Sequence, residues 1–131
     1  MKRLFFISLA ILFLCAVMVN AADLEKIKIA VASSDKTAKA SVSNEAAKCP
    51  YYLIFNSEGK LTEVIDNPYG DASGGAGPSA ADFLAQKGVT IVVAGNFGSK
   101  MINTLKNNGI AHIEFEGGVD DAVKRALEGG Q

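Results

Sequence analysis

The sequence of 131 residues is poor in the residue types that bind soft metals and build acid-base catalysts. It holds one histidine, two cysteines and no tryptophan, and it has no CxxC or HxxxH spacing. Cys15 lies within residues 1–21, which form an N-terminal leader, so only Cys49 remains in residues 22–131. An intramolecular disulfide and a self-sufficient structural metal site are therefore excluded for that part of the chain.

Motifs of the common enzyme classes are also missing. There is no GxSxG elbow, no GxxxxGK[ST] loop and no GxGxxG after a strand. His112 lies in an alternating strand pattern, which favours a partly exposed strand histidine over a general base. The strand-like runs 27–32 and 89–94 contain no carboxylate that could hold the divalent cations of a nuclease. We therefore expect that the protein is not an enzyme.

Neither sign of charge is in large excess. The chain has 13 Lys and Arg residues against 14 Asp and Glu. Two of the basic residues, Lys2 and Arg3, belong to the leader, which leaves a formal charge of −3 on the rest. A generic nucleic-acid-binding surface is not supported by this balance.

The one long hydrophobic run is at the start of the chain. Residues 4–19 are apolar except Ser8, and this run is shorter than the ~20 residues that a helix needs to cross a bilayer. Small or neutral residues follow it, so the pattern predicts a signal peptide over residues 1–21, cleaved between Ala21 and Ala22. We expect an exported protein, periplasmic or extracellular, with no stable membrane span after cleavage. An uncleaved N-terminal anchor is the alternative.

Residues 22–131 are long enough for one domain with its own core. Apolar periodicity and turn residues predict the element order β-β-β-α-β-α-β-α. This order favours an α/β fold with a mixed five-stranded sheet, in which an antiparallel hairpin lies on one side, parallel crossovers lie on the other and helices cover the faces. The predicted strands are residues 27–32, 51–55, 61–65, 89–94 and 110–115, and the predicted helices are residues 79–87, 100–108 and 119–128.

Two segments deviate from simple patterns. Residues 33–48 are polar without clear periodicity, which indicates a functional or poorly ordered loop with a short extended piece at 40–43. Residues 89–94 are apolar apart from Thr90, which predicts a strand buried on both faces.

Two glycine-rich connections, residues 73–78 and 94–99, each lead from a predicted strand toward a predicted helix. Such connections gather at the carboxyl ends of parallel strands, where backbone N–H groups and helix termini can hold an anion. We expect Ser99 to cap the second helix. Tight turns without a ligand are the alternative explanation for the glycines. The candidate binding residues in these connections are Gly74, Gly75, Gly77, Asn96 and Gly98.

Four strings together resemble the dinitrogenase iron-molybdenum cofactor biosynthesis family, the NifX and NifB carboxy-terminal type of domain. They are IKIAVASSD (27–35), CPYYLIFN (49–56), GGAGPSAADFLAQKGV (74–89) and VVAGNFGSKMINTLKNNGI (92–110). The resemblance covers about residues 27–127. It implies a ribonuclease H-like fold without nuclease chemistry, and an iron-sulfur or molybdenum-containing cluster as the cofactor class.

The family's His-Phe-Gly-Arg stretch aligns with residues 45–48, directly before Cys49. Its favoured cluster ligand, the histidine, corresponds to Glu45, and its basic last position corresponds to Lys48. The chain is thus a divergent member by this resemblance. A carboxylate is a poor replacement for imidazole at a soft cluster, which makes the adjacent Cys49 a candidate metal ligand. A buried apolar filler is the alternative role for this cysteine.

The sequence leaves two main hypotheses for function. The first is a non-catalytic domain that binds a metal cluster or a small anionic ligand through Glu45, Lys48 and the glycine connections. The second is a degenerate exported scaffold or protein-interaction domain that has lost the ligand. An uncharacterised enzyme is a weaker third.

Overall fold

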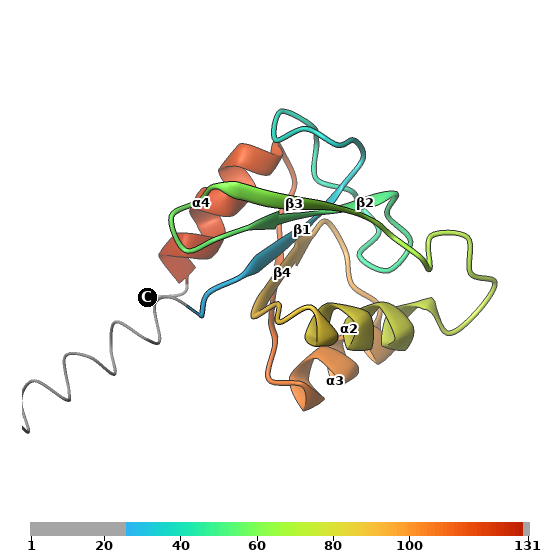
Figure 1. The fold of residues 1–131 in the computed structure, drawn as a ribbon. Helices are drawn as coiled ribbons and strands as arrows, with labels where there is room; N and C mark the ends of the chain where they lie inside the picture. Colours follow the sequence, from blue (N-terminus) through green and yellow to red (C-terminus); the bar gives the residue numbers. More distant parts are fainter. Residues whose placement is uncertain (1–25, 130–131) are drawn as a thin grey trace, which may run out of the picture.

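A computed structural model describes residues 26–129 (Figure 1). The predicted signal peptide, with its cleavage site at Ala21 and Ala22, lies outside the described residues. No helix among residues 26–129 is both long and apolar enough to span a membrane. The elements are β1 (Ile29–Ser33), β2 (Tyr51–Phe55), β3 (Leu61–Asp66), α2 (Ala76–Gln86), β4 (Ile91–Ala94), α3 (Ser99–Asn107), β5 (Ala111–Glu114) and α4 (Val119–Gly129).

The five strands form one mixed sheet in the order β3-β2-β1-β4-β5. β1, β2 and β3 pair antiparallel, whereas β1, β4 and β5 pair parallel. The expected mixed sheet is therefore confirmed. The carboxyl ends of β1, β4 and β5 meet at one edge of the sheet, where the connections to α3 and α4 begin.

Helices cover both faces of the sheet, with α2 and α3 on one side and α4 on the other (Figure 1). Alternation along the strands supplies a separate core to each face. In β1, Ala30 and Ala32 pack on the α2 and α3 side, while Ile29 and Val31 pack on the α4 side. β4 is buried along its whole length, as its apolar sequence predicted.

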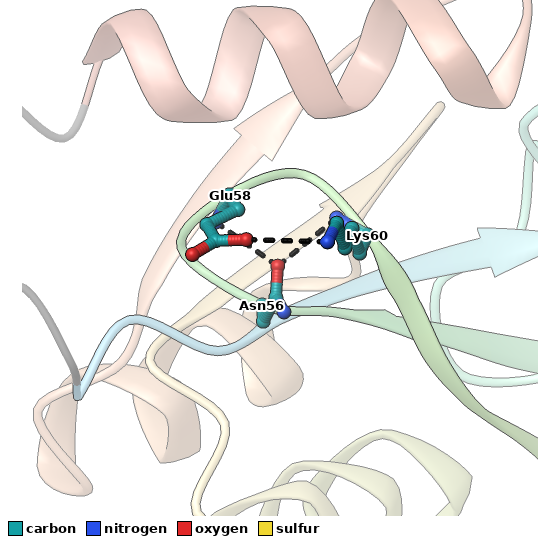
Figure 2. A network of polar contacts seen from close by, with 3 residues as sticks. All are labelled: Asn56, Glu58 and Lys60. Carbon is teal, nitrogen blue, oxygen red and sulfur yellow. Dashed lines mark hydrogen bonds and ion pairs between the residues drawn. The ribbon is translucent and has the colours of Figure 1, made fainter.

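The hairpin between β2 and β3 is closed by Asn56, shown in Figure 2. Its Oδ1 atom accepts hydrogen bonds from the backbone N–H groups of Glu58 and Lys60, both at 3.0 Å. Gly59 adopts φ 79°, a conformation that glycine tolerates best. The ion pair of Lys60 Nζ with Glu58 Oε2, at 3.6 Å, is exposed and adds little to stability.

The segment 34–48, expected to be a functional or a poorly ordered loop, is bonded closely to the rest of the protein, which favours the first alternative. Its backbone bridges β1 at Val42 and the start of α4 at Ser41. Val42 also donates to the Gly117 carbonyl at 2.9 Å, and Ala38, Ala40 and Val42 pack on the α4-side core. Polar composition concealed this anchoring because only every second residue around position 40 faces the core.

Candidate functional site

A cleft of about 450 Å³ opens at the carboxyl end of the parallel strands. Three segments form its walls: residues 44–48, the N-terminus of α2 and the β4–α3 connection with the first turn of α3. The lining residues are Asn44, Glu45, Ala46, Ala47, Lys48, Gly75, Ala76, Gly77, Pro78, Asn96, Gly98, Ser99, Lys100 and Met101.

Most of the residues proposed from the sequence meet in this cleft. Glu45 and Lys48 lie on one wall, and the glycine connections supply Gly75, Gly77, Asn96 and Gly98. Gly74 does not line it, and neither does Cys49. Four further lining residues were not predicted from the sequence: Asn44 on the wall 44–48, and Ser99, Lys100 and the buried Met101 in the first turn of α3.

Both helix N-termini facing the cleft lack a side-chain cap. Gly75 precedes α2 with φ 69°, and Gly98 precedes α3 in an extended conformation. Ser99 is the first residue of α3, so its expected role as the cap was wrong; Gly98 takes that position. Neither first turn carries an acidic residue. Uncapped N–H groups and the positive ends of two helix dipoles therefore face one cleft.

The charged side chains on the cleft are two lysines and one glutamate. Lys48 and Lys100 are exposed and come from different walls, and Glu45 is the only carboxylate of the lining. No group of three or more His, Cys, Asp or Glu side chains among residues 26–129 is arranged to hold a metal ion. The cleft thus offers hydrogen-bond donors and positive charge, but few side chains that could bind a metal.

Gly77 belongs to the packing of the two helices as well as to the cleft. It lies inside α2, which begins at Ala76, three residues before the predicted start. A Cβ atom at this position would lie 3.1 Å from the Cβ atom of Met101 in α3. The absent side chain therefore lets the two first turns approach closely.

Gly95 allows a second close approach, between the end of β4 and the wall 44–48. A Cβ atom there would lie 2.5 Å from the Asn44 side-chain oxygen, Oδ1, and 2.9 Å from the Asn44 Cα atom. The Gly95 N–H donates to the Ser43 carbonyl at 2.8 Å, and the Ala46 N–H donates to the Asn96 carbonyl at 3.2 Å. This contact brings Glu45 beside Asn96 as a parallel bridge.

Cys49 lies behind the wall rather than in the cleft. Its side chain is completely buried, and burial raises the pKa of the thiol to about 12. The thiol contacts the Ala46 carbonyl at 3.8 Å and the Asn67 side-chain nitrogen at 3.9 Å. A protonated, enclosed thiol is a weak metal ligand, so these observations favour the buried-filler role. The ligand role stays a prediction.

His112 is half-buried in β5, in agreement with the expected strand histidine. Its ring packs edge-on against Phe97, with the ring centroids 5.1 Å apart. It does not line the cleft.

A family model identifies the class to which the chain belongs. The chain belongs to the dinitrogenase iron-molybdenum cofactor family, whose model matches residues 25–129. This confirms the resemblance seen in the four sequence strings.

Two solved structures share the fold over most of this chain, and a further relative is similar in sequence. The apo form of the orange protein from Desulfovibrio gigas is 28% identical, with a TM-score of 0.73, covering 78% of this chain and 88% of that chain. A candidate NifB protein from Thermotoga is 33% identical, with a TM-score of 0.65, covering 79% and 89%. An uncharacterized protein of Methanocaldococcus jannaschii is 28% identical over 92 residues, 67% of this chain and 78% of that protein.

Proposed function

We propose that this protein is a non-catalytic carrier domain whose cleft binds a compact anionic ligand. The ligand would be a metal cluster of the kind that the family name indicates. The observation that carries the proposal is the convergence of two uncapped helix N-termini and two lysines on one cleft. Preoriented N–H groups and ammonium groups stabilise an anion without any metal ligand from the protein. The family match supports a metal-containing cargo.

The cleft residues do not fit a soft cluster that is ligated directly by side chains. Such clusters favour thiolate or imidazole, yet the lining supplies one carboxylate, Glu45, and one buried thioether, Met101. They do fit a polyanion whose outer oxygen or sulfur atoms accept hydrogen bonds. The cargo would therefore be held through its outer atoms, with Lys48 and Lys100 balancing its charge.

The absence of enzyme activity belongs to the same proposal. β1 and β4 contribute no carboxylate to the cleft end of the sheet, so the residues expected for metal-dependent nuclease chemistry are missing from these strands. We infer a ribonuclease H-like fold that serves binding; the strand order β3-β2-β1-β4-β5 supports this.

Equilibrium dialysis against molybdate tests the binding claim with a simple oxyanion. We expect saturable binding that weakens as salt rises, because the attraction depends on exposed lysines. Sulfate, which has the same charge and shape, should compete for the same site. Failure of the protein to bind either anion at low salt would contradict an anion-binding cleft.

The second candidate is a scaffold that has kept the fold and lost the ligand. Residues 45–47, Glu-Ala-Ala, favour it because they replace the histidine stretch expected from the family resemblance. A protein that takes up no iron, copper or molybdate after reconstitution, with or without sulfide, would support this alternative and direct the search toward protein partners.

We also propose that the protein is exported, with residues 1–21 removed. The apolar run and the small residues after it support this proposal. Intact mass measurement of protein from its native cells should give a chain that begins at Ala22. A full-length mass in the membrane fraction would instead support the uncleaved anchor.

A further inference from the structure

Asn67 follows β3 directly, and its side chain forms hydrogen bonds to the backbone of the cleft wall and of the residue after it. We call these hydrogen bonds the Asn67 clamp. Its Nδ2 atom donates hydrogen bonds to the carbonyl oxygens of Ala47, at 2.8 Å, and Cys49, at 2.9 Å. Both acceptors belong to the stretch that forms or immediately follows the cleft wall 44–48. The bonds span 20 and 18 residues, so they fix tertiary structure and not a local turn.

Tyr52 holds the neighbouring carbonyl. Its hydroxyl group, completely buried, donates to the Ala46 oxygen at 2.5 Å. The carbonyls of Ala46, Ala47 and Cys49 are thus all bound by side chains from the body of the protein. The backbone that carries Lys48 is fixed on both sides of that residue.

Asn67 also organises the connection toward α2. Its Oδ1 atom accepts a hydrogen bond from the Tyr69 N–H at 3.0 Å, and its carbonyl accepts one from the Gly70 N–H at 3.3 Å. The Tyr69 ring in turn packs edge-on against Phe83 of α2, with centroids 6.1 Å apart. One side chain therefore links the Lys48 wall to the segment that leads to the N-terminus of α2.

We propose that Asn67 is a positioning residue for the cleft: it sets the Lys48 wall relative to the N-terminus of α2. The ligand part of this inference rests on the proposed function, whereas the clamp itself does not. Losing Asn67 would leave the Ala47 and Cys49 carbonyls without these donors and allow the wall to open locally.

Cys49 reports such opening, because its buried thiol reacts with reagents only when the segment moves. The experiment compares thiol labelling of the full chain with Asn67→Ala, in a Cys15→Ser background that leaves Cys49 as the only thiol. Asn56→Ala is the matched control, since Asn56 also closes a turn with two side-chain hydrogen bonds but in the distant hairpin. Asn67→Asp serves as a second variant, which keeps the acceptor atom and removes both donated bonds.

We expect labelling to accelerate about tenfold or more in both Asn67 variants, with little dependence on urea up to ~1 M, and to remain unchanged in Asn56→Ala. A labelling rate that does not change in the Asn67 variants would show that Asn67 does not hold the wall. A rate that rises steeply with urea, as in global unfolding, would show the same. In the same variants, molybdate affinity should fall about tenfold or more while Asn56→Ala binds normally. Fast labelling with unaltered molybdate binding would overturn the positioning role.

If the wild-type protein binds no molybdate, the proposed function fails, and the labelling rates still decide whether Asn67 holds the wall. The two failures are therefore distinguishable.

Discussion

Gly77 of α2 and Met101 of α3 meet so closely that a Cβ atom on the glycine would lie 3.1 Å from the methionine Cβ atom. Both residues also line the cleft. The contact that joins the two helices is thus part of the candidate site, and the distance between their N-termini depends on a residue with no side chain.

Gly77→Val should destabilise the protein, because its added carbons would push α2 away from α3. We expect the free energy of unfolding to fall by about 2 kcal/mol, within the range for overpacked positions. Urea denaturation measures this change. Gly98→Val is the control, since Gly98 has an ordinary φ of −72° and no atom within 4 Å of its Cβ position. Equal destabilisation by the two variants would contradict the packing role of Gly77.

Gly98→Val should weaken molybdate binding while the protein stays folded, because the new side chain would enter the cleft beside the N-terminus of α3. Affinity should fall about tenfold or more, measured by equilibrium dialysis. This position is a cleaner probe than Gly75, where φ 69° makes any other residue strained. Normal binding by a folded Gly98→Val protein would place the anion elsewhere.

Replacing both cleft lysines, Lys48→Met with Lys100→Met, should reduce molybdate affinity about tenfold or more and flatten its salt dependence. Thermal stability should change little, because both side chains are exposed. Lys124→Met on α4 is the matched control, exposed on the opposite side of the sheet. Retained affinity in the double variant would show that these two lysines do not hold the anion. An equal loss in Lys124→Met would show that general surface charge explains the binding.

The free energy of unfolding should fall as pH rises above the ordinary pKa of a thiol. The Cys49 thiol should account for part of this pH dependence. The pKa of the buried thiol is raised to about 12, so between about pH 9 and 12 the unfolded chain releases this proton and the folded chain retains it. The contribution to the slope is about 1.4 kcal/mol per pH unit. Cys49→Ala should therefore flatten the pH dependence, and urea denaturation at about pH 8, 9 and 10 measures this. An unchanged slope would mean that the thiol ionises in the folded protein as it does in the unfolded one.

The sequence predicted the sheet well because each strand has a simple apolar pattern. β4 was recognised from its uninterrupted apolar run, and the hairpin from Asn56 and Gly59 between two β-rich stretches. Helix starts were less accurate. α2 begins before Pro78, since a proline in the first turn loses no hydrogen bond, and the glycine-rich composition hid that turn.

The site was predicted in part for similar reasons. Glycine connections and the family stretch predicted Glu45, Lys48 and Gly98 as site residues because such positions carry local signals, and all three line the cleft. The wall 44–48 and its supports depend on contacts between distant residues. Gly95 must lack a side chain because Asn44 lies against it, and Asn67 binds a carbonyl 20 residues away. No local pattern records either relationship.

Elemental analysis of protein purified anaerobically from its native cells tests the central claim most directly. We expect stoichiometric metal in the wild type and in Cys49→Ser, and its loss in the Lys48→Met, Lys100→Met variant, because the cleft holds an anionic cargo by charge and hydrogen bonds. Loss of metal in Cys49→Ser with retention in the lysine variant would contradict this account and make the thiol a ligand. A wild-type protein that stays free of metal after reconstitution would contradict the carrier function itself.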